Sequence, residues 1–297
     1  MRLNKYTLFG FLAVFLWSAT VALVRSISEQ LGPVTAGAAV YLTGGILACT
    51  YWWSQNKFVF SKERFPVKYF FSTGSLFLIY TLNLFLALGL AKDRIQAIEL
   101  GLVNYLWPGL TILLSLLIFS RKVTLGLIPG TLLAFVGIFL VLIPSGNFSW
   151  PVFLQHIIDN PIAYFCGLIA AFSWAFYSNL TRLWKSVEDA GYVPFYILIT
   201  GVFLLLLSMV FPEKSQWGWG VLGEVLFLSF TTVLAYAFWE MSMQKGDIAL
   251  VLPFTYLTPL FSTLVSSVYL GVFPDARLWV GCIALVTGSF ISWKSMR

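Results

Sequence analysis

The sequence predicts an all-α integral membrane protein in which ten transmembrane helices form two inverted five-helix repeats around a central cavity. Three observations lead to this fold class. The 297-residue chain is 59% hydrophobic and only 10% charged, whereas soluble domains average about 25% charged residues. Its apolar residues fall into blocks of roughly 18–25, each long enough for a helix to cross the hydrocarbon core. Motifs of the first half also recur in order in the second half.

The ten predicted spans are apolar stretches separated by short segments rich in charged residues, glycine and proline. We expect them at residues 7–27, 33–54, 67–91, 95–119 and 124–143, and then at 161–182, 191–211, 219–243, 248–271 and 277–293. The stretches lack the polar–apolar alternation of membrane-barrel strands, which favours helices. The longest connection, residues 146–160, contains Asn147 and Pro151 and is predicted to be an extracytoplasmic linker.

The distribution of Lys and Arg predicts that both termini are cytoplasmic. With the N-terminus inside, thirteen of the eighteen basic residues lie in inner segments and five in outer segments. Cytoplasmic loops of membrane proteins carry such an excess of basic residues. The net charge of +6 is therefore a topology signal, and it does not indicate a nucleic-acid-binding surface.

The internal repeat relates the two halves at two nearly equal shifts. Matches that occur in order at only two shifts indicate a duplication. The pairs are Trp17 and Trp174, Arg25 and Arg182, and Gly44 and Gly201 at a shift of 157, followed by Tyr105 and Tyr256, Pro108 and Pro259, Gly130 and Gly281, and Gly137 and Gly288 at a shift of 151.

Each half holds an odd number of predicted spans, so the second half must enter the membrane with the opposite orientation. We predict a first repeat at residues 1–145 and an inverted second repeat at 161–297. Inverted repeats are typical of secondary transporters, whose substrate site lies near the membrane midplane between the halves. Channels also use inverted repeats, so this feature favours a transporter but leaves a channel possible.

Three tryptophans lie in the middle of predicted spans: Trp17, Trp107 and Trp174. Most of the others lie near span ends, where tryptophan commonly sits at the membrane–water interface. A mid-span indole either packs against a neighbouring helix or lines a cavity, and both interpretations stand. The repeat favours a cavity for Trp17 and Trp174, because they occupy equivalent positions in the two halves.

Polar side chains recur at helical spacing on five spans and predict a shared, water-filled cavity. Within a bilayer such side chains must face protein or water, although seams of small and hydroxyl residues also pack helices together. In addition to the three tryptophans, the predicted substrate-binding residues are Ser18, Tyr80, Asn83, Asn104, Tyr105, Tyr177, Tyr236 and Tyr256.

Two acids and two prolines within the spans are further functional residues. An intramembrane acid indicates a functional site by default, so Glu99 and Glu240 are hypothetical sites for proton coupling or for a substrate amine. Basic residues of the adjacent loops could pair with either acid instead. A mid-helix proline kinks its helix. We expect Pro108 and Pro259 to bend their spans alike, either as hinges for alternating access or as static kinks.

The sequence predicts neither an enzyme nor a cofactor. Its three cysteines lie in separate apolar stretches without metal-binding or disulfide spacing, and His156 is the only histidine, so no metal site is predicted. The chain has no phosphate-binding loop for ATP and no nucleophile–base pair or metal-binding acidic cluster. No catalytic residue is assigned. The expected partners are a small-molecule substrate and membrane lipid, and the oligomeric state is left open.

Several blocks of sequence resemble the drug/metabolite transporter superfamily, to which EamA-type proteins belong. The resemblance covers nearly the whole chain and is most specific between Gln96 and Pro108; the blocks Phe15 to Ser18 and Leu31 to Pro33 match as well. Within the superfamily, these blocks are most similar to those of bacterial exporters of aromatic amino acids. The resemblance implies a cavity lined by the first, third, fourth, sixth, eighth and ninth spans.

The implied function is export of aromatic and other neutral amino acids across the bacterial inner membrane by a secondary transporter. The resemblance implies substrate binding chiefly for Trp17, Tyr80, Tyr105, Trp107 and Trp174. Aromatic rings stack on aromatic side chains and attract ammonium groups. The alternative is a multidrug exporter of organic cations, which would depend on a buried acid. Glu240 departs from the family pattern, in which an amide occupies that position.

Overall fold

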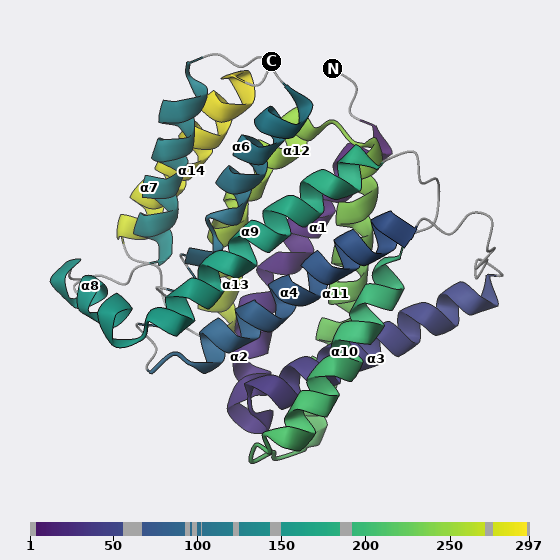
Figure 1. Ribbon diagram of the computed structural model, residues 1–297. Coiled ribbons are helices and arrows are strands. Elements are labelled where there is room, and N and C mark those ends of the chain that lie inside the picture. The colour runs from purple at the N-terminus through teal and green to yellow at the C-terminus, as the bar shows by residue number, and fades with distance from the viewer. Residues whose placement is uncertain are drawn as a thin grey trace.

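The computed structural model describes residues 4–55, 67–92, 96, 100–101, 103–120, 125–142, 150–184, 192–270 and 276–295. All regular elements in these ranges are helices, and they pack into one bundle (Figure 1). In chain order they are α1 (Lys5–Ser18), α2 (Thr20–Leu31), α3 (Pro33–Ser54), α4 (Val67–Gly89), α6 (Trp107–Phe119), α7 (Leu127–Leu142), α8 (Trp150–Asp159), α9 (Pro161–Leu183), α10 (Val193–Val210), α11 (Trp219–Lys245), α12 (Ile248–Phe254), the 3₁₀ helix η1 (Thr255–Leu257), α13 (Thr258–Leu270) and α14 (Ala276–Ser295).

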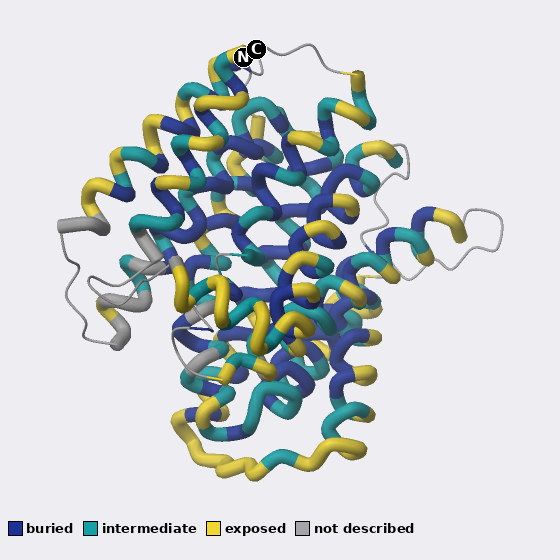
Figure 2. The backbone as a smooth tube through the Cα atoms, turned by 60° about the vertical axis from the view of Figure 1, so that its left-hand side comes forward, coloured by how far each residue is buried: buried dark blue, intermediate teal, exposed yellow. Residues whose placement is uncertain are grey.

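The length and composition of these helices are those of a multi-pass membrane protein. Six helical stretches among the described residues are long and apolar enough to cross a membrane: Lys5–Leu31, Pro33–Ser54, Val67–Leu88, Pro161–Leu183, Val193–Val210 and Trp219–Lys245. Three shorter apolar stretches are Trp107–Phe119, Leu127–Leu140 and Ile248–Ser262. Exposed residues lie along the outward sides of the helices, and buried residues lie toward the middle of the bundle (Figure 2).

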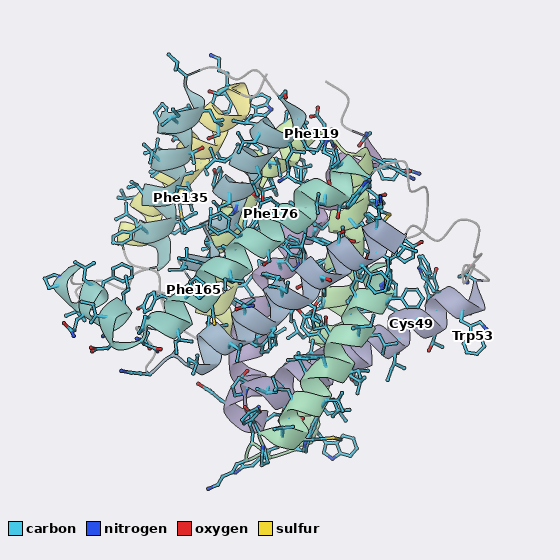
Figure 3. All side chains as sticks on the ribbon, in the orientation of Figure 1. Cys49, Trp53, Phe119, Phe135, Phe165 and Phe176 are labelled. Atoms are coloured by element: carbon cyan, nitrogen blue, oxygen red, sulfur yellow. The ribbon has the colours of Figure 1, made fainter. Side chains whose placement is uncertain are left out.

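The outward surface is rich in large apolar side chains. Phe165 of α9 is 64% exposed, and Trp53, near the end of α3, is 74% exposed. Figure 3 shows Trp53 at the margin of the molecule, away from the centre of the bundle. Trp219, at the start of α11, is 89% exposed. Exposed tryptophans at helix ends are typical of proteins that contact the interfacial region of a bilayer.

The first predicted span consists of two helices, α1 and α2, which meet at Ala19. The side chain of Asn4 caps the start of α1 by accepting a hydrogen bond of 2.8 Å from the backbone N–H of Thr7. The corresponding span of the second half, α9, runs without interruption from Pro161 to Leu183. Two spans that match in sequence therefore differ in continuity.

Both proline-bearing spans are interrupted at the positions that the repeat makes equivalent. Tyr105 and Leu106 form a turn directly before α6, in which Pro108 is the second residue. Tyr256 lies in η1 directly before α13, in which Pro259 is the second residue. Proline suits the first turn of a helix because the N–H that it lacks would have no intrahelical partner there. Each expected bend therefore coincides with an interruption of the α-helix directly before the proline-bearing helix, and hinge motion at these points stays a prediction.

Helices α7 and α14 lie side by side (Figure 1) and approach most closely at four glycines. A Cβ atom added to Gly137 would lie 2.8 Å from the carbonyl oxygen of Gly281, and one added to Gly288 would lie 2.6 Å from that of Gly130. The shift of 151 exchanges these residues, so it turns the first contact into the second. A two-fold relation between the two halves, as predicted from the repeat, requires contacts that exchange in this way.

Three further helix pairs surround the middle of the bundle: α3 with α10, α4 with α9, and α1 with α11. In the repeat, α3 is equivalent to α10, α4 to α11 and α1 to α9. Exchanging the two halves therefore keeps α3 beside α10 and replaces the pair of α4 and α9 by the pair of α11 and α1. Helices α3 and α10 pack closely because a side chain is absent at Gly45 and Gly201. An added Cβ atom at either position would collide with the backbone of Leu198 or of Leu42, respectively.

The start of α1 and the end of α14 lie at the same end of the bundle in both views (Figures 1 and 2). Within the stretch interpreted as a linker, residues 150–159 form the helix α8, which the sequence interpretation did not include. Phe153 and Ile157 of α8 pack on a small group of buried residues that includes Tyr164 of α9. This connection is therefore partly ordered against the bundle.

Candidate functional site

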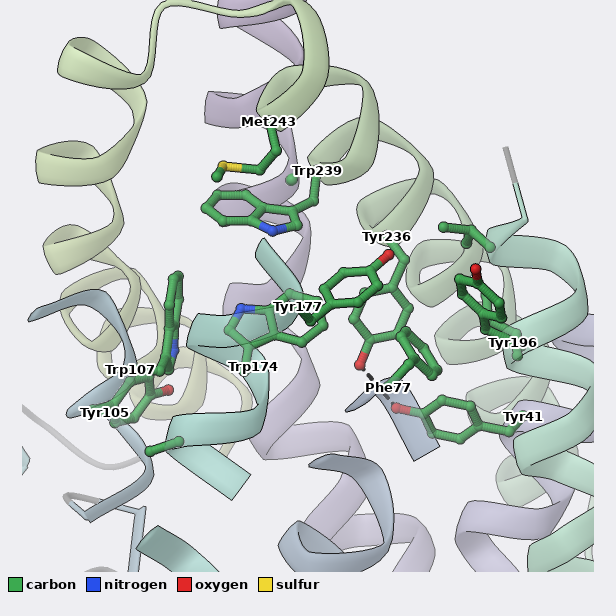
Figure 4. Packing of buried hydrophobic residues seen from close by; sticks show 14 of the residues in the cluster. Tyr41, Phe77, Tyr105, Trp107, Trp174, Tyr177, Tyr196, Tyr236, Trp239 and Met243 are labelled. Atoms are coloured by element: carbon green, nitrogen blue, oxygen red, sulfur yellow. Dashed lines mark hydrogen bonds between the residues drawn. The ribbon is translucent and has the colours of Figure 1, made fainter. Parts of the chain in front are cut away.

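Four tryptophans from α1, α6, α9 and α11 meet in the bundle and form the tryptophan cluster: Trp17, Trp107, Trp174 and Trp239. Figure 4 shows the last three of them. The centroid of the Trp17 ring lies 6.2 Å from that of Trp107, 5.5 Å from that of Trp174 and 5.3 Å from that of Trp239. The rings of Trp107 and Trp239 are 5.6 Å apart. All four distances fall within the range of about 4.5–7 Å in which aromatic pairs attract.

A shell of further rings surrounds Trp174. Its indole stacks on Tyr177 at 5.0 Å and lies 4.8 Å from Tyr80 and 5.4 Å from Tyr236. Phe77 packs edge-on against Tyr236 at 4.9 Å (Figure 4). The site is therefore built of rings from α1, α4, α6, α9 and α11, which correspond to five of the six spans that the family resemblance implies.

The indole N–H groups of the cluster differ in whether the protein already satisfies them. Trp239 Nε1 donates a hydrogen bond of 3.0 Å to the hydroxyl of Ser178, and both residues are fully buried. Among the described residues, Trp17 and Trp174 have no acceptor for their N–H groups. An indole N–H away from water favours a hydrogen-bond partner, so these two donors are available to a bound molecule.

The break before α6 lies against the cluster, because Trp107 is the first residue of that helix. Tyr105 lies beside Trp107 in Figure 4, and its hydroxyl interacts with Ser262 of α13. The side-chain oxygen of Asn104 is buried and has no hydrogen-bond partner among the described residues. The first N–H groups of a helix also have no intrahelical acceptor. The break thus adds polar groups to an aromatic site.

Six of the predicted substrate-binding residues come together in the cluster and its shell of rings: Trp17, Tyr80, Trp107, Trp174, Tyr177 and Tyr236. Tyr105 lies next to them in the turn before α6, and Asn104 directly precedes that turn. Glu99 falls outside the described residues.

Three predicted residues make other contacts. Tyr256 packs edge-on against Phe135 of α7 at 6.0 Å, and its hydroxyl donates a hydrogen bond of 3.4 Å to Thr131. The amide of Asn83 and the hydroxyl of Ser18 donate to backbone carbonyls of their own helices, one turn earlier. Their polar groups are therefore engaged locally, and Tyr256 is directed toward α7.

Glu240, on α11, is only 2% exposed. One carboxylate oxygen accepts hydrogen bonds from the hydroxyl of Tyr69 at 2.6 Å and from the amide of Gln244 at 3.4 Å. The backbone N–H of Val193, at the start of α10, donates to the same carboxyl group. The ammonium of Lys245 lies over the ring of a different residue, Tyr6, at 5.6 Å.

Three residues of the site were not predicted from the sequence: Trp239, Phe77 and Tyr41. Trp239 lies on α11 one turn after Tyr236, and Phe77 lies on α4 three residues before the predicted residue Tyr80. The hydroxyl groups of Tyr41 and Tyr236 share a hydrogen bond of 2.9 Å (Figure 4). Helical spacing could have indicated Phe77, but it does not distinguish a ring in the site from one that faces lipid.

Comparison with known proteins agrees with the family resemblance. The model of the EamA-like transporter family matches residues 4–143 and again residues 161–293. The chain is 33% identical over 299 residues to the aromatic amino acid exporter YddG of Escherichia coli K12, with 100% of this chain and 99% of that protein covered. It is 31% identical over 303 residues to the protein of the same name from Salmonella typhimurium, with the same coverage.

Two further comparisons cover almost the full length. The aromatic amino acid exporter YddG of Ancylobacter novellus is 27% identical over 298 residues, with 98% of each chain covered. A solved crystal structure that is 26% identical superposes on this chain with a TM-score of 0.82 and covers 100% of both chains. The similarity therefore extends over both halves and is not confined to single motifs.

Proposed function

This chain belongs to the EamA-like transporter family, and on that premise we propose that it exports aromatic and other neutral amino acids across the bacterial inner membrane by alternating access. The observation that carries the proposal is the tryptophan cluster, in which two indole N–H groups have no acceptor among the described residues. A zwitterionic aromatic amino acid offers a ring for stacking, an ammonium group for cation–π contact and a carboxylate for hydrogen bonds. The names of the three exporter relatives support the same substrate class.

We propose ten spans, with residues 1–145 and 161–297 as inverted repeats and with both termini in the cytoplasm. Two matches to one family model, one in each half, support the duplication. The exchange of the glycine contacts between α7 and α14 supports an approximate two-fold relation. The excess of Lys and Arg in the inner segments supports the orientation.

The rings of the cluster touch one another, so a substrate can enter only if they separate. We propose that Pro108 and Pro259 permit this movement, because the helix breaks beside them interrupt the backbone hydrogen bonds that stiffen a continuous helix. Rocking of the two halves about such breaks would expose the cluster first to the cytoplasm and then to the outside. The proposal includes no catalytic residue and no cofactor.

The alternative, a multidrug exporter of organic cations, requires a buried acid that pairs with the cation. Glu240 is buried, but its carboxyl group already accepts hydrogen bonds from Tyr69, Gln244 and Val193. The neutral amino acid is therefore the better-supported substrate. Neutralising Glu99 and Glu240 separates the two functions, because only a cation exporter depends on a negative charge for binding.

Transport by purified protein in liposomes tests the proposal. Liposomes loaded with unlabelled phenylalanine should take up labelled phenylalanine without ATP, and unlabelled tryptophan should compete. Liposomes without protein and parallel uptake of tetraphenylphosphonium, an organic cation, are the controls. Phenylalanine uptake no faster than in empty liposomes, together with carriage of the cation, would establish the alternative.

A further inference from the structure

Glu240 is placed where several helices converge. It lies five residues before the end of α11; Tyr69, which donates to it, is the third residue of α4, and Val193 is the first residue of α10. Glu240, whose carboxyl group accepts hydrogen bonds from these donors, is only 2% exposed. A single carboxyl group therefore links the ends of three helices, which must move relative to one another if the bundle opens at that side.

The groups that face Glu240 carry no positive charge within the described part of the chain. Its donors are a phenol, an amide and a backbone N–H. The other titratable groups within electrostatic range are the phenols of Tyr177 on α9 and of Tyr192 and Tyr196 at the start of α10. Burying a carboxylate away from water is costly unless a cation compensates its charge.

Two described cations, on α9 and α11, contact groups other than Glu240. On α9, the guanidinium of Arg182 donates to the backbone carbonyls of Met243 and Gly246, at 3.1 and 3.4 Å. On α11, the ammonium of Lys245 lies over the ring of Tyr6. The carboxyl group of Glu240 can therefore avoid an uncompensated charge by binding a proton.

Glu240 is also connected to the substrate site. Trp239 precedes it in the chain, and Tyr236 lies one turn earlier on the same face of α11. Tyr177, which stacks on Trp174 at 5.0 Å, lies within electrostatic range of the carboxyl group. A change in the charge of Glu240 would therefore act on helices and rings that form the tryptophan cluster.

We propose that Glu240 binds and releases one proton in each transport cycle, so that a proton moves inward as an amino acid moves outward. The inference rests on the proposed function. The carboxylate takes its proton from water on the side where the substrate leaves and returns it to water on the opposite side. The amide of Gln244, which is half-buried one turn closer to the end of α11, provides polar contact toward that surface. The zwitterion has no net charge, so each cycle moves one positive charge inward.

The ammonium group of the substrate is a less suitable partner for this carboxyl group. An ammonium needs free acceptor positions, whereas three donors of the protein already point at Glu240. The substrate also has its own site in the tryptophan cluster, where the indole N–H groups of Trp17 and Trp174 have no acceptor among the described residues. The geometry thus assigns the proton to Glu240 and the substrate to the cluster.

The test uses the whole protein in liposomes that contain a pH-sensitive dye, with the membrane potential held at zero by valinomycin and equal potassium concentrations. A phenylalanine gradient should drive protons in the opposite direction, at about one proton per molecule carried. Glu240→Gln keeps an oxygen for the Tyr69 hydroxyl but cannot bind a proton. We expect this variant to retain measurable exchange of labelled for unlabelled phenylalanine. Its rate of proton movement should be at least tenfold lower than that of the wild type.

Glu224→Gln is the matched control, since Glu224 lies on the same helix and bonds to the hydroxyl of Ser26 at 3.0 Å, away from the cluster. It should move protons as the wild type does. Wild-type protein that exchanges phenylalanine without moving protons would overturn the inference and leave the proposed function intact, even if the Gln variant failed to fold. Undiminished proton movement in Glu240→Gln would overturn it as well. Absence of phenylalanine exchange in the wild type would instead refute the proposed function.

Discussion

The indole rings of Trp17 and Trp174 meet edge to face, with their centroids 5.5 Å apart and an interplanar angle of 81°. They are also the residues that the shift of 157 makes equivalent. Each half of the chain therefore contributes one ring to the same contact. A substrate that binds between the halves must replace this contact with contacts of its own.

Replacing Trp17 or Trp174 by Ala should weaken transport of phenylalanine. Loss of one aromatic pair removes about 1 kcal/mol beyond the lost area, so we expect the half-saturating concentration to rise roughly fivefold. The measurement is initial uptake at several phenylalanine concentrations, normalised to folded protein in the membrane. Wild-type affinity and rate in both Ala variants would mean that the two rings serve only in packing.

The Phe variants of the same residues separate stacking from hydrogen bonding. Phe keeps an aromatic face but has no N–H donor. If the free indole N–H bonds to the substrate carboxylate, Trp→Phe should restore only part of the affinity that the Ala variant loses. Full restoration would indicate that stacking alone accounts for the contribution of that ring.

Ser178→Ala should destabilise the protein, because it removes the acceptor of the buried Trp239 N–H group. An unsatisfied buried donor costs about 1–3 kcal/mol. Thermal unfolding in detergent should therefore occur at a lower temperature. The cost of Ser178→Ala should largely disappear when it is combined with Trp239→Phe, which has no donor to satisfy. Simple addition of the two effects would contradict the hydrogen bond as the cause.

Gly201→Ala should destabilise the pair of α3 and α10, since the added Cβ would collide with the backbone of Leu42. Overpacking of this kind typically costs about 1–3 kcal/mol. Gly223→Ala on α11 is the matched control, because nothing lies within 4 Å of its added Cβ. Alanine is favoured over glycine inside a helix, so the control should unfold at the same temperature as the wild type or higher. Equal stability of the two variants would contradict the close approach.

The orientation of the chain can be tested with reporter fusions. Fusions after Lys57 and after Lys245 should report the cytoplasm, and a fusion at Gly146 should report the outside, because the basic residues gather in the predicted inner segments. The opposite pattern would reverse the proposed topology. An outside signal at only one of the two lysine positions would change the number of spans.

Much of the site could be predicted from positions within single helices and from the repeat. Trp174 and Tyr177 are three residues apart and share a face of α9, and their rings do stack. The repeat singled out Trp17 and Trp174, and the structure brings them into contact. Recognition of the superfamily from the motifs is confirmed by the family match over both halves.

Other features depend on contacts that spacing along the chain does not define. Trp239 lies near the predicted end of its span, yet its partner is Ser178, 61 residues away on α9. Tyr256 was expected beside the cavity as the counterpart of Tyr105, but it lies in a 3₁₀ turn and contacts α7. Helical periodicity no longer gives the direction of a side chain where the helix itself is broken. The helix α8 was missed because a proline-containing connection gives no signal of its packing partner.

Four indoles in mutual contact also form an optical probe that the protein carries without labelling. Electronic transitions of closely packed indoles couple, so their near-ultraviolet circular dichroism depends on how the rings are arranged. The contacts of Trp17 with Trp174 and Trp239 are those that must change if the halves separate. Subtracting the spectrum of Trp17→Phe from that of the wild type would remove the contribution of the remaining tryptophans. Opening and closing could then be followed in real time, in lipid, as the substrate is added.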